Sequence, residues 1–353
     1  MPDTSKADKN DITESGADFE FVASSQTQAE KPAPNFARRI QMLMIAIIVA
    51  VIAYTAGWFW FGSQLVKSTQ AAISEAQLNQ QTIICDQPEA RGYPFRMGLH
   101  CTKTGFADGN LKIDAGAFRS AAQVYEPRRI ISELDGPLNI AEANLKPFTL
   151  NWALAHASFS GDGGLPERVS VEIEKPVWAE TAAPTLQMGS ANLGAFHMRQ
   201  GDNNQIDFAA NIENAKIKDA PAFNFSSDAS ISGATRFDLA LDSGKPLVEI
   251  LRGNQGELRN VSLTFIDGGN ITISGPFSLS EAGLLSGAFN LKANQAAALI
   301  DNISKTAAAL GVAQSNLAAI KAMAVNDQFD FKISIKDGNA SLGFIPLGKI
   351  PAL

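Results

Sequence analysis

The sequence predicts a mainly β protein attached to a membrane by one helix. Two observations carry this prediction: an apolar run from Ile40 to Phe61 and, after it, many short segments in which apolar and polar residues alternate. The run is long enough to cross a hydrocarbon layer of about 30 Å as a helix. Alternation with a period of two is typical of antiparallel strands with one apolar face. We therefore expect an elongated, curved antiparallel sheet, a groove or half-barrel, with a few helices near residues 127–134 and 294–324.

Four regions are expected along the chain. Residues 1–37 are polar, acidic and poor in apolar side chains, which predicts a disordered cytoplasmic tail. Residues 38–62 form the transmembrane helix. Residues 63–82 are rich in Ala and Gln and contain no proline, so the helix should continue as a stalk. Residues 83–353 form the exported β-rich domain.

The ends of the apolar run predict its orientation. Arg38 and Arg39 directly precede it, while Trp58 and Trp60 lie near its far end, where amphipathic rings favour the membrane interface. Positive charge stays on the cytoplasmic side, so the N-terminus should be cytoplasmic and the large domain should lie across the membrane. The alternative is a signal peptide cleaved after Val51-Ile52-Ala53, which would export the same domain.

The net charge of the chain limits the classes of binding partner that we expect. The formal net charge is −7, and most of it lies in residues 1–37. Binding to nucleic acid requires a basic face, so no nucleic-acid partner is expected. The exported region is nearly neutral and predicts no ligand that is steered by charge.

Two cysteines, Cys85 and Cys101, lie on the exported side and predict a disulfide. A hairpin that pairs them would place Asp86 opposite His100 and its turn at residues 92–94, where glycine and proline favour chain reversal. The alternatives are a thiol nucleophile or a metal site with His100, but no fourth metal ligand is in view.

Alternation and turn residues place the strands, of which we expect a dozen or more. Glycine, aspartate and asparagine cluster between the alternating segments, as is typical of hairpin turns. Pro346 and Pro351 exclude a central strand at the C-terminus. The clearest alternating segments are 169–174, 206–213, 237–241, 271–273 and 329–336, and the clearest turns are 108–110, 161–164, 201–203, 267–270 and 337–339.

Few helices are expected after the span. A proline can open a short helix over residues 127–134, and Gly136-Pro137 can close it. Residues 294–324 hold a pair of helices, the first capped by Asn294 and the second by Ser315. These helices are too few to cover a large sheet.

The apolar side of the sheet must therefore be hidden in another way. Two sheets can pack together, the sheet can close into a barrel, or an open curved sheet can hold lipid on its concave side. The motif S-G-x-F-x-L occurs at 274–279 and again at 286–291, which suggests repeated hairpins in an elongating sheet.

Several short motifs follow one another in a fixed order from the span onward. They are Gly57-Trp58, Cys85, Gly92-Tyr93-Pro94-Phe95, Cys101, Tyr125-Glu126-Pro127, Gly136-Pro137-Leu138 and Leu347-Gly348-Lys349-Ile350-Pro351. In these motifs the chain resembles an alphaproteobacterial envelope family, the domain of unknown function 2125, over nearly all of its length after the span. Residues 273–300 are more loosely similar to the AsmA-like envelope proteins. The latter resemblance implies an inner-membrane anchor and a periplasmic β-groove suited to acyl chains, and it carries over no catalytic residue.

The sequence gives little sign of catalysis. His100, His156 and His197 are far apart in strand-like segments, and a core or surface role is expected for each. No nucleophile elbow, phosphate loop, zinc motif or calcium loop occurs. Glu172 and Glu174 share a strand face at a spacing that suits acid–base chemistry, but solvated strand charges explain them. We expect no enzyme, no cofactor and no metal site; a hydrolase that acts on the envelope is the third reading.

The leading hypothesis is a periplasmic protein anchored in the inner membrane whose apolar β-groove binds or conveys a hydrophobic ligand. The expected partners are the membrane and phospholipid acyl chains. The alternative is a structural or interaction module with a closed core filled by side chains, which docks to another envelope protein through an exposed apolar patch.

Overall fold

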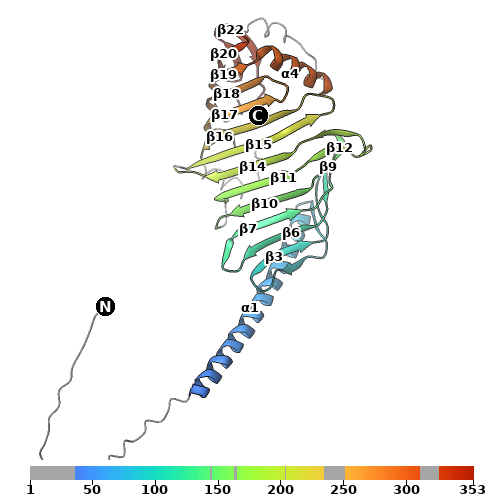
Figure 1. Cartoon of the computed structure of the whole chain (residues 1–353), viewed down its shortest axis with the longest axis vertical. Coiled ribbons are helices and arrows are strands. Elements are labelled where there is room, and N and C mark those ends of the chain that lie inside the picture. Colours follow the sequence, from blue (N-terminus) through green and yellow to red (C-terminus); the bar gives the residue numbers. More distant parts are fainter. Residues whose placement is uncertain (1–35, 144, 163–164, 203, 234–250, 311–325) are drawn as a thin grey trace, which may run out of the picture. The chain divides into compact units, whose positions relative to one another are not determined.

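The computed structural model describes residues 36–143, 145–162, 165–202, 204–233, 251–310 and 326–353 (Figure 1). The chain divides into two units, Met1–Ala53 and Tyr54–Leu353. Helix α1 spans Phe36–Leu78 and so includes the predicted span and the predicted stalk as far as Leu78. Residues 81 and 82 of the predicted stalk already belong to a strand. The predicted tail lies outside the described residues, except for residues 36 and 37, which already belong to α1. By length and composition α1 can cross a membrane.

Nearly everything after α1 is antiparallel β-structure, as expected. We call one set of strands the short sheet and the other the long sheet. The short sheet has the order β1-β4-β5-β8-β9-β12-β13. Its strands are β1 (Gln81–Cys85), β4 (Thr104–Asp108), β5 (Leu111–Ala115), β8 (Leu138–Glu142), β9 (Leu145–Asn151), β12 (Val177–Glu180) and β13 (Gln187–Ser190).

The long sheet has the order β2-β3-β6-β7-β10-β11-β14-β15, followed in sequence order by β16 to β22. Strand β15 also pairs with β13 and so joins the two sheets. The strands of the first half are β2 (Glu89–Arg91), β3 (Arg96–Cys101), β6 (Phe118–Gln123), β7 (Glu126–Leu134), β10 (Leu154–Ser160), β11 (Arg168–Glu174) and β14 (Leu193–Gln200). Those of the second half are β15 (Gln205–Ile217), β16 (Phe223–Ser232), β17 (Gln255–Phe265), β18 (Asn270–Leu279), β19 (Leu285–Asn294), β20 (Gln328–Lys336), β21 (Asn339–Leu342) and β22 (Ile345–Lys349).

In the first half the chain passes repeatedly from one sheet to the other through corners of two or three residues. Backbone hydrogen bonds continue across these corners: Gly116 N–H donates to Asp135 O at 3.0 Å, and Lys175 N–H donates to Asn192 O at 2.8 Å. Each pair of segments is therefore one long strand with a bend, and the two sheets are the two arms of a folded meander. The corners are residues 86–88, 102–103, 116–117, 135–137, 152–153, 175–176 and 191–192.

The described strands after β15 do not pair with the short sheet, and a helix covers them instead. Helix α4 (Ala296–Leu310) packs on the sheet, and Leu299 and Ile300 form a core cluster with Phe265 and Phe329. Figure 1 shows α4 against the last strands of the long sheet. The apolar surface of the second half is thus closed by the polypeptide itself.

The helix expected over residues 127–134 is wrong, because this segment is strand β7. Ile130 and Ile131 are β-branched and fit a pleated surface. Both edges of β7 are paired, with β6 on one side and β10 on the other. Pro127 lies near the start of the strand, outside both registers, where a missing N–H is tolerated.

The helix expected from residue 294 is confirmed, but its predicted cap is not. Asn294 ends β19, and α4 begins at Ala296. Asp327 caps the helix, because its Oδ1 atom accepts a hydrogen bond from Ala297 N–H at 2.7 Å. This residue is distant in sequence, so a local pattern could not identify it. Ser315 and the second predicted helix lie outside the described residues, as does the strand segment 237–241.

The disulfide between Cys85 and Cys101 is present, but the predicted hairpin register is wrong. Glu89, not Asp86, pairs with His100. A positive φ of 50° at Gln87 breaks the strand between β1 and β2. The disulfide therefore connects the end of β1 in the short sheet to the end of β3 in the long sheet.

The two S-G-x-F-x-L copies lie on the paired strands β18 and β19. They are thus two halves of one hairpin rather than two repeated hairpins. Phe277 on β18 faces Gly287 on β19. Pro346, as expected, lies on an edge strand, β22, whose one partner within the described part of the chain is β21.

Candidate functional site

One face of the long sheet is apolar from β11 to β20. Strand register places residues from successive strands opposite one another, so that their side chains form rows across the sheet. The first row is Ile173, Gly194, Ile212, Phe225, Leu263, Ile271, Ala293 and Phe329; the second is Val171, Phe196, Ala210, Ser227, Val261, Ile273, Leu291 and Phe331.

The opposite face of the same strands is polar. Side chains point alternately to the two faces, so the residues between the apolar rows form a polar row. This row is Glu172, Ala195, Asn211, Ser226, Ser262, Thr272, Lys292 and Asp330. The alternation seen in the sequence therefore corresponds to one mainly apolar face, interrupted at Ser227, and one mainly polar face, interrupted at Ala195.

The apolar face is covered at one end and open at the other. Under α4, Phe329 is 6% exposed and Ala293 is 1% exposed. Toward the first half, Phe196 on β14 is 41% exposed and Phe159 on β10 is 38% exposed. A second cluster of Leu165, Met198 and Ile206 closes part of this face near β14 and β15.

Between the two arms of the bent strands lies a cavity of about 260 Å³. Its surface is almost wholly apolar. The long sheet contributes residues from four strands, and the short sheet contributes Leu138 and Leu150. Because both arms line the cavity, the bend itself creates this apolar space. The residues from the long sheet that contact it include Phe118, Leu134, Ala157, Val171 and Ile173.

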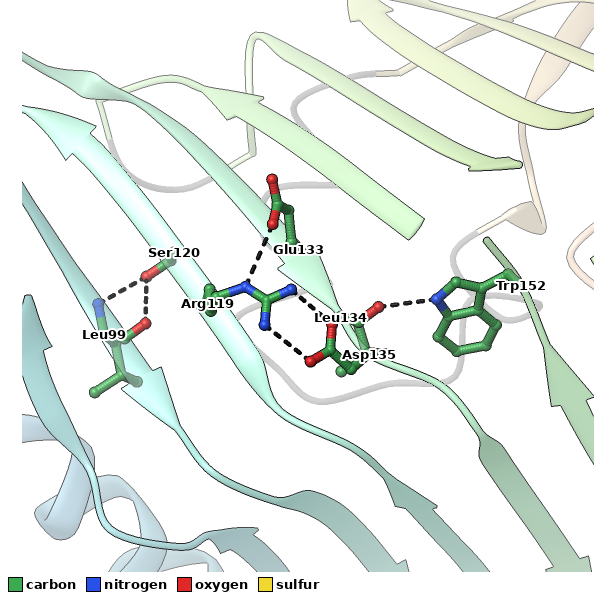
Figure 2. A network of polar contacts seen from close by, with 7 residues as sticks. All are labelled: Leu99, Arg119, Ser120, Glu133, Leu134, Asp135 and Trp152. Carbon is green, nitrogen blue, oxygen red and sulfur yellow. Dashed lines mark hydrogen bonds and ion pairs between the residues drawn. The ribbon is translucent and has the colours of Figure 1, made fainter. Parts of the chain in front are cut away.

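Trp152 lies at a corner and lines one side of the cavity. Its Nε1–H donates to Leu134 O at 2.9 Å, so the indole is fixed to the neighbouring strand (Figure 2). Gly136 lies against this ring: a Cβ atom there would be 3.6 Å from Trp152 Cε2. The contact holds the corners at residues 135–137 and 152–153 together, and the Trp152 ring presents an apolar surface to the cavity.

Asp135, the residue directly after β7, anchors the polar side of the corner at residues 135–137. Arg119 on β6 donates two hydrogen bonds to the Asp135 carboxylate, at 2.8 and 2.6 Å, and one to Glu133 at 3.3 Å (Figure 2). The hydrogen bond from Arg119 lowers the pKa of the Asp135 carboxyl below its usual value. The ion pairs thus fix β6 to β7 and to the corner that follows β7.

Strand β6 also holds β3 through Ser120. Its Oγ atom accepts from Leu99 N–H at 2.9 Å and lies 3.3 Å from Leu99 O (Figure 2). The side chain replaces ladder hydrogen bonds where the β3–β6 register is interrupted. The strands approach so closely there that a Cβ atom on Gly98 would lie 1.7 Å from Ser120 O, which explains the glycine.

The residues predicted to set topology lie on α1. Arg38 and Arg39 are exposed at the start of the helix, and the membrane orientation that they indicate stays a prediction. Trp58 is 6% exposed, and its Nε1–H donates to Arg96 O at 2.9 Å. Trp60 is 56% exposed. Of the two tryptophans, Trp60 projects outward while Trp58 packs against the β-domain.

The three histidines lie on three separate strands. His156 Nε2 is 3.4 Å from a carboxylate oxygen of Glu172, and His197 Nδ1 is 2.9 Å from Ser170 Oγ. His100 faces Glu89 on one side and Arg119 on the other. Across the described ranges, no three side chains of the metal-ligating types lie together. The absence of an enzymatic activity, a cofactor and a metal ion stays a prediction.

Comparison with known proteins gives one match. The family model described as "Uncharacterized protein conserved in bacteria (DUF2125)" matches residues 58–351. The chain belongs to the DUF2125 family. No curated protein and no solved structure matches it. The match begins inside α1 and extends through β22, so this DUF2125 chain carries both the bent and the straight halves of the sheet within the family region.

The motifs behind the resemblance lie mainly at turns, corners and edges of the DUF2125 fold. Residues 92–95 form the turn between β2 and β3, and Gly136-Pro137 forms a corner. Residues 347–349 belong to the edge strand β22. These positions determine how the chain turns. The looser resemblance to AsmA-like proteins stays a prediction.

Proposed function

We propose that the part of the apolar face of the long sheet that α4 leaves uncovered and the inner side of the short sheet form a groove that binds lipid acyl chains. One observation carries the proposal: the apolar rows continue from the cavity between the arms into the part of the sheet where Phe196 is 41% exposed. A long, half-exposed apolar track suits a flexible hydrocarbon chain better than it suits a compact ligand.

Burial of methylene groups provides the free energy of binding. Each methylene that is transferred from water contributes about 0.8 kcal/mol, so a few row positions are enough to hold part of a chain. The long sheet contains the fifteen strands β2, β3, β6, β7, β10, β11 and β14–β22. At about 4.8 Å per strand the sheet extends about 70 Å. Lipid headgroups would remain in water at the open side while the tails follow the rows.

The proposed site of action is the bacterial envelope. The apolar helix α1 supports attachment to a membrane. The arginine pair before it supports a cytoplasmic N-terminus, with the β-domain in the periplasm and the anchor in the inner membrane. The groove would then receive acyl chains from the bilayer to which it is attached.

A variant that fills the cavity tests this proposal. Ala157 and Ser158 are consecutive on β10, so Ala157 faces the cavity and Ser158 faces the other side. We expect Ala157→Phe to reduce the phospholipid that co-purifies with the full chain in mild detergent, as counted by mass spectrometry. The matched control Ser158→Phe should retain the wild-type amount. Equal lipid content in the two variants, or lipid-free wild-type protein, would contradict the proposal.

The edge strand β22 favours a second candidate, an interaction module that docks to another envelope protein. Among the described strands it pairs only with β21, and Phe344, Ile345 and Leu347 are exposed on or beside it. An exposed apolar edge strand can accept a strand from a partner. Photo-crosslinking from position 345 in intact cells should capture a protein if this candidate holds, and solvent or lipid alone if it does not.

A further inference from the structure

The turn between β2 and β3 is hydrogen-bonded to α1. Tyr54 Oη donates to Pro94 O, and Trp58 Nε1–H donates to Arg96 O at 2.9 Å. Thr55 Oγ1 lies 2.8 Å from Tyr93 Oη. The Tyr93 ring also contacts Trp58 edge-on, with ring centroids 5.5 Å apart. The turn therefore lies level with residues 54–58 of the helix.

Those helix residues belong to the apolar run that ends at Phe61. A hydrocarbon layer of about 30 Å takes about 20 helical residues, and the run from Ile40 to Phe61 provides little more than that. If α1 crosses the membrane with this run, residues 54–58 lie within the last turns before the far interface. The β2–β3 turn, bonded to the same residues, then lies at the depth of that interface.

Exposed aromatic side chains surround this turn. Phe95 is 70% exposed and Tyr125 is 77% exposed. Tyr125 lies in the turn between β6 and β7, and the two turns are linked because Val124 N–H donates to Phe95 O at 3.0 Å. Aromatic residues favour the membrane interface, so this exposed group suits a lipid surface.

The backbone carbonyl groups of the β2–β3 turn are hydrogen-bonded, as a site of low polarity requires. Unpaired carbonyl groups cost several kcal/mol in hydrocarbon. Gly92 O accepts from Arg96 N–H at 2.9 Å, and Phe95 O accepts from Val124 N–H. Pro94 O and Arg96 O accept from the two helix side chains described above. Four carbonyl groups of the turn are thus paired before any lipid approaches.

Two arginines lie beside the aromatic group. Arg96 and Arg129 line a cavity of about 370 Å³ on the polar face, next to Gln123. Among the described residues neither guanidinium group has a carboxylate partner within ion-pair distance. Guanidinium groups bind phosphate oxygens strongly, and the phosphates of a bilayer lie just outside its hydrocarbon layer.

We propose that the β2–β3 and β6–β7 turns form a membrane-contacting platform. Phe95 and Tyr125 insert into the leaflet at the far end of the span, and Arg96 and Arg129 bind the phosphate groups of anionic lipids there. The platform holds the first strands of the sheet at the bilayer surface. This inference does not depend on what the groove carries, because it concerns the outer ends of the strands and the lipid surface alone.

The depth of the turn can be measured directly. Phe95→Trp places a fluorophore in the platform, and Phe344→Trp places one at a more exposed phenylalanine at the opposite end of the long sheet. The full-length variants are compared in nanodiscs with and without brominated lipid, and the signal of the native tryptophans is subtracted. We expect bromine to quench most of the added emission at position 95 and little at position 344. Tyr125→Trp serves as a second probe if Phe95→Trp folds poorly.

The arginines require a separate measurement. The full chain is extracted from nanodiscs that contain equal amounts of phosphatidylglycerol and phosphatidylcholine, and the retained lipids are counted by native mass spectrometry. We expect wild type to retain more phosphatidylglycerol and the double variant Arg96→Gln/Arg129→Gln to lose that preference. The control Lys332→Gln/Lys336→Gln removes the same charge from β20 and should retain it.

These outcomes separate the platform from the groove. Equal quenching at positions 95 and 344 would overturn insertion of the turn, and an unchanged lipid preference in the arginine variant would overturn phosphate binding. Ala157→Phe should leave the quenching at position 95 and the preference for phosphatidylglycerol as in wild type even if it lowers the total amount of retained lipid. Failure of the groove proposal would therefore leave the platform results intact, and the reverse also holds.

Discussion

The two halves of the long sheet have the same pattern of alternation but differ in how their apolar face is shielded. In the first half, strands bend into a second sheet and leave an apolar cavity of about 260 Å³ between the arms. In the second half, strands run on without such corners, and α4 packs directly on them. Identical strand periodicity therefore leads to an open face or a closed one, depending on whether the cover is a bent arm or a helix.

The corners explain why the first half can enclose space. Residues that interrupt a regular strand occur at the bends, such as Gly116, Gly136-Pro137 and Pro176. After β15 no corner of this kind redirects a described strand to the short sheet. A helix that packs against a flat surface fills it with side chains, whereas two arms that diverge from a bend leave room between them.

The largest expected loss of stability comes from a substitution in the closed half. Leu299 of α4 is 2% exposed and packs among Phe265 and Phe329. We expect Leu299→Ala to lower the free energy of unfolding by about 2–5 kcal/mol, because it removes buried methyl groups and leaves a cavity. Urea unfolding of the full chain in detergent measures this loss.

Phe196→Ala provides the matched test of the open half. This side chain is larger than Leu299 but is 41% exposed. We expect its truncation to cost less than Leu299→Ala in lipid-free protein. A loss as large as that of Leu299→Ala would show that the face is closed at β14 as well and would remove the contrast.

The disulfide connects the two arms of the open half, and its removal should have the next largest effect on the free energy of unfolding. Cys85 and Cys101 are 16 residues apart in sequence. A closed loop of this size stabilises by about 3 kcal/mol in the chain-entropy model. We expect Cys85→Ser/Cys101→Ser to lose about this amount and to exchange amide hydrogens faster in β1–β6, while β18–β20 retain their protection. Uniformly faster exchange would show that the halves unfold as one unit.

The sequence was sufficient to predict the faces of the sheet because alternation is local. It predicted α1, the strands around 169–174 and 206–213, and the helix that begins near 296. It failed at residues 127–134, where proline at one end and Gly-Pro at the other resemble helix boundaries although Ile130 and Ile131 favour a strand. Pairing with two neighbouring strands decided the outcome, and a local window contains no information on pairing.

The bends and the cavity could not be predicted for the same reason. A corner looks like a turn between two strands, and only the partner strands show that the chain continues into another sheet. Asp327 caps α4 from 30 residues away in sequence. Cys85 forms a disulfide with Cys101, and the positive φ of Gln87 breaks the strand between β1 and β2. The signal that could have been used was the regular recurrence of turn residues within segments too short for separate hairpins.

A lower pH should weaken two ion pairs to different extents. One lies on the polar face of each half of the long sheet. Asp207 on β15 is partly buried, which by itself raises its pKa, but hydrogen bonds from Arg259 and Arg199 outweigh this, and the pKa is lowered overall. A carboxyl with a lowered pKa stabilises the fold above its unfolded value of about 3.9, and this stabilisation is lost as the pH falls through the folded pKa.

We therefore expect Asp207→Asn to cost about 1–2 kcal/mol at pH 7, a difference that shrinks as the pH falls below about 4. The pKa of Asp135 is also lowered, but the side chains of Asp135 and Arg119 are both nearly half exposed. Asp135→Asn should cost less, within about 1 kcal/mol. Urea unfolding at pH 7 and pH 3 checks both; a cost for Asp207→Asn that does not change with pH would refute the electrostatic cause.

A similarly small effect is expected at Trp152, which lies at a corner beside the cavity. Trp152→Phe removes the Nε1–H that donates to Leu134 O and leaves that carbonyl without its side-chain donor. We expect a loss of about 1 kcal/mol, which is the usual contribution of one such hydrogen bond. Trp178→Phe makes the same change of ring at a position where the ring packs beside Gly189. If the hydrogen bond fixes the bend, only the Trp152 variant should expose the amides of residues 134–137 to faster hydrogen exchange. Equal exchange in both variants would mean that ring packing, and not the hydrogen bond, holds the two arms apart.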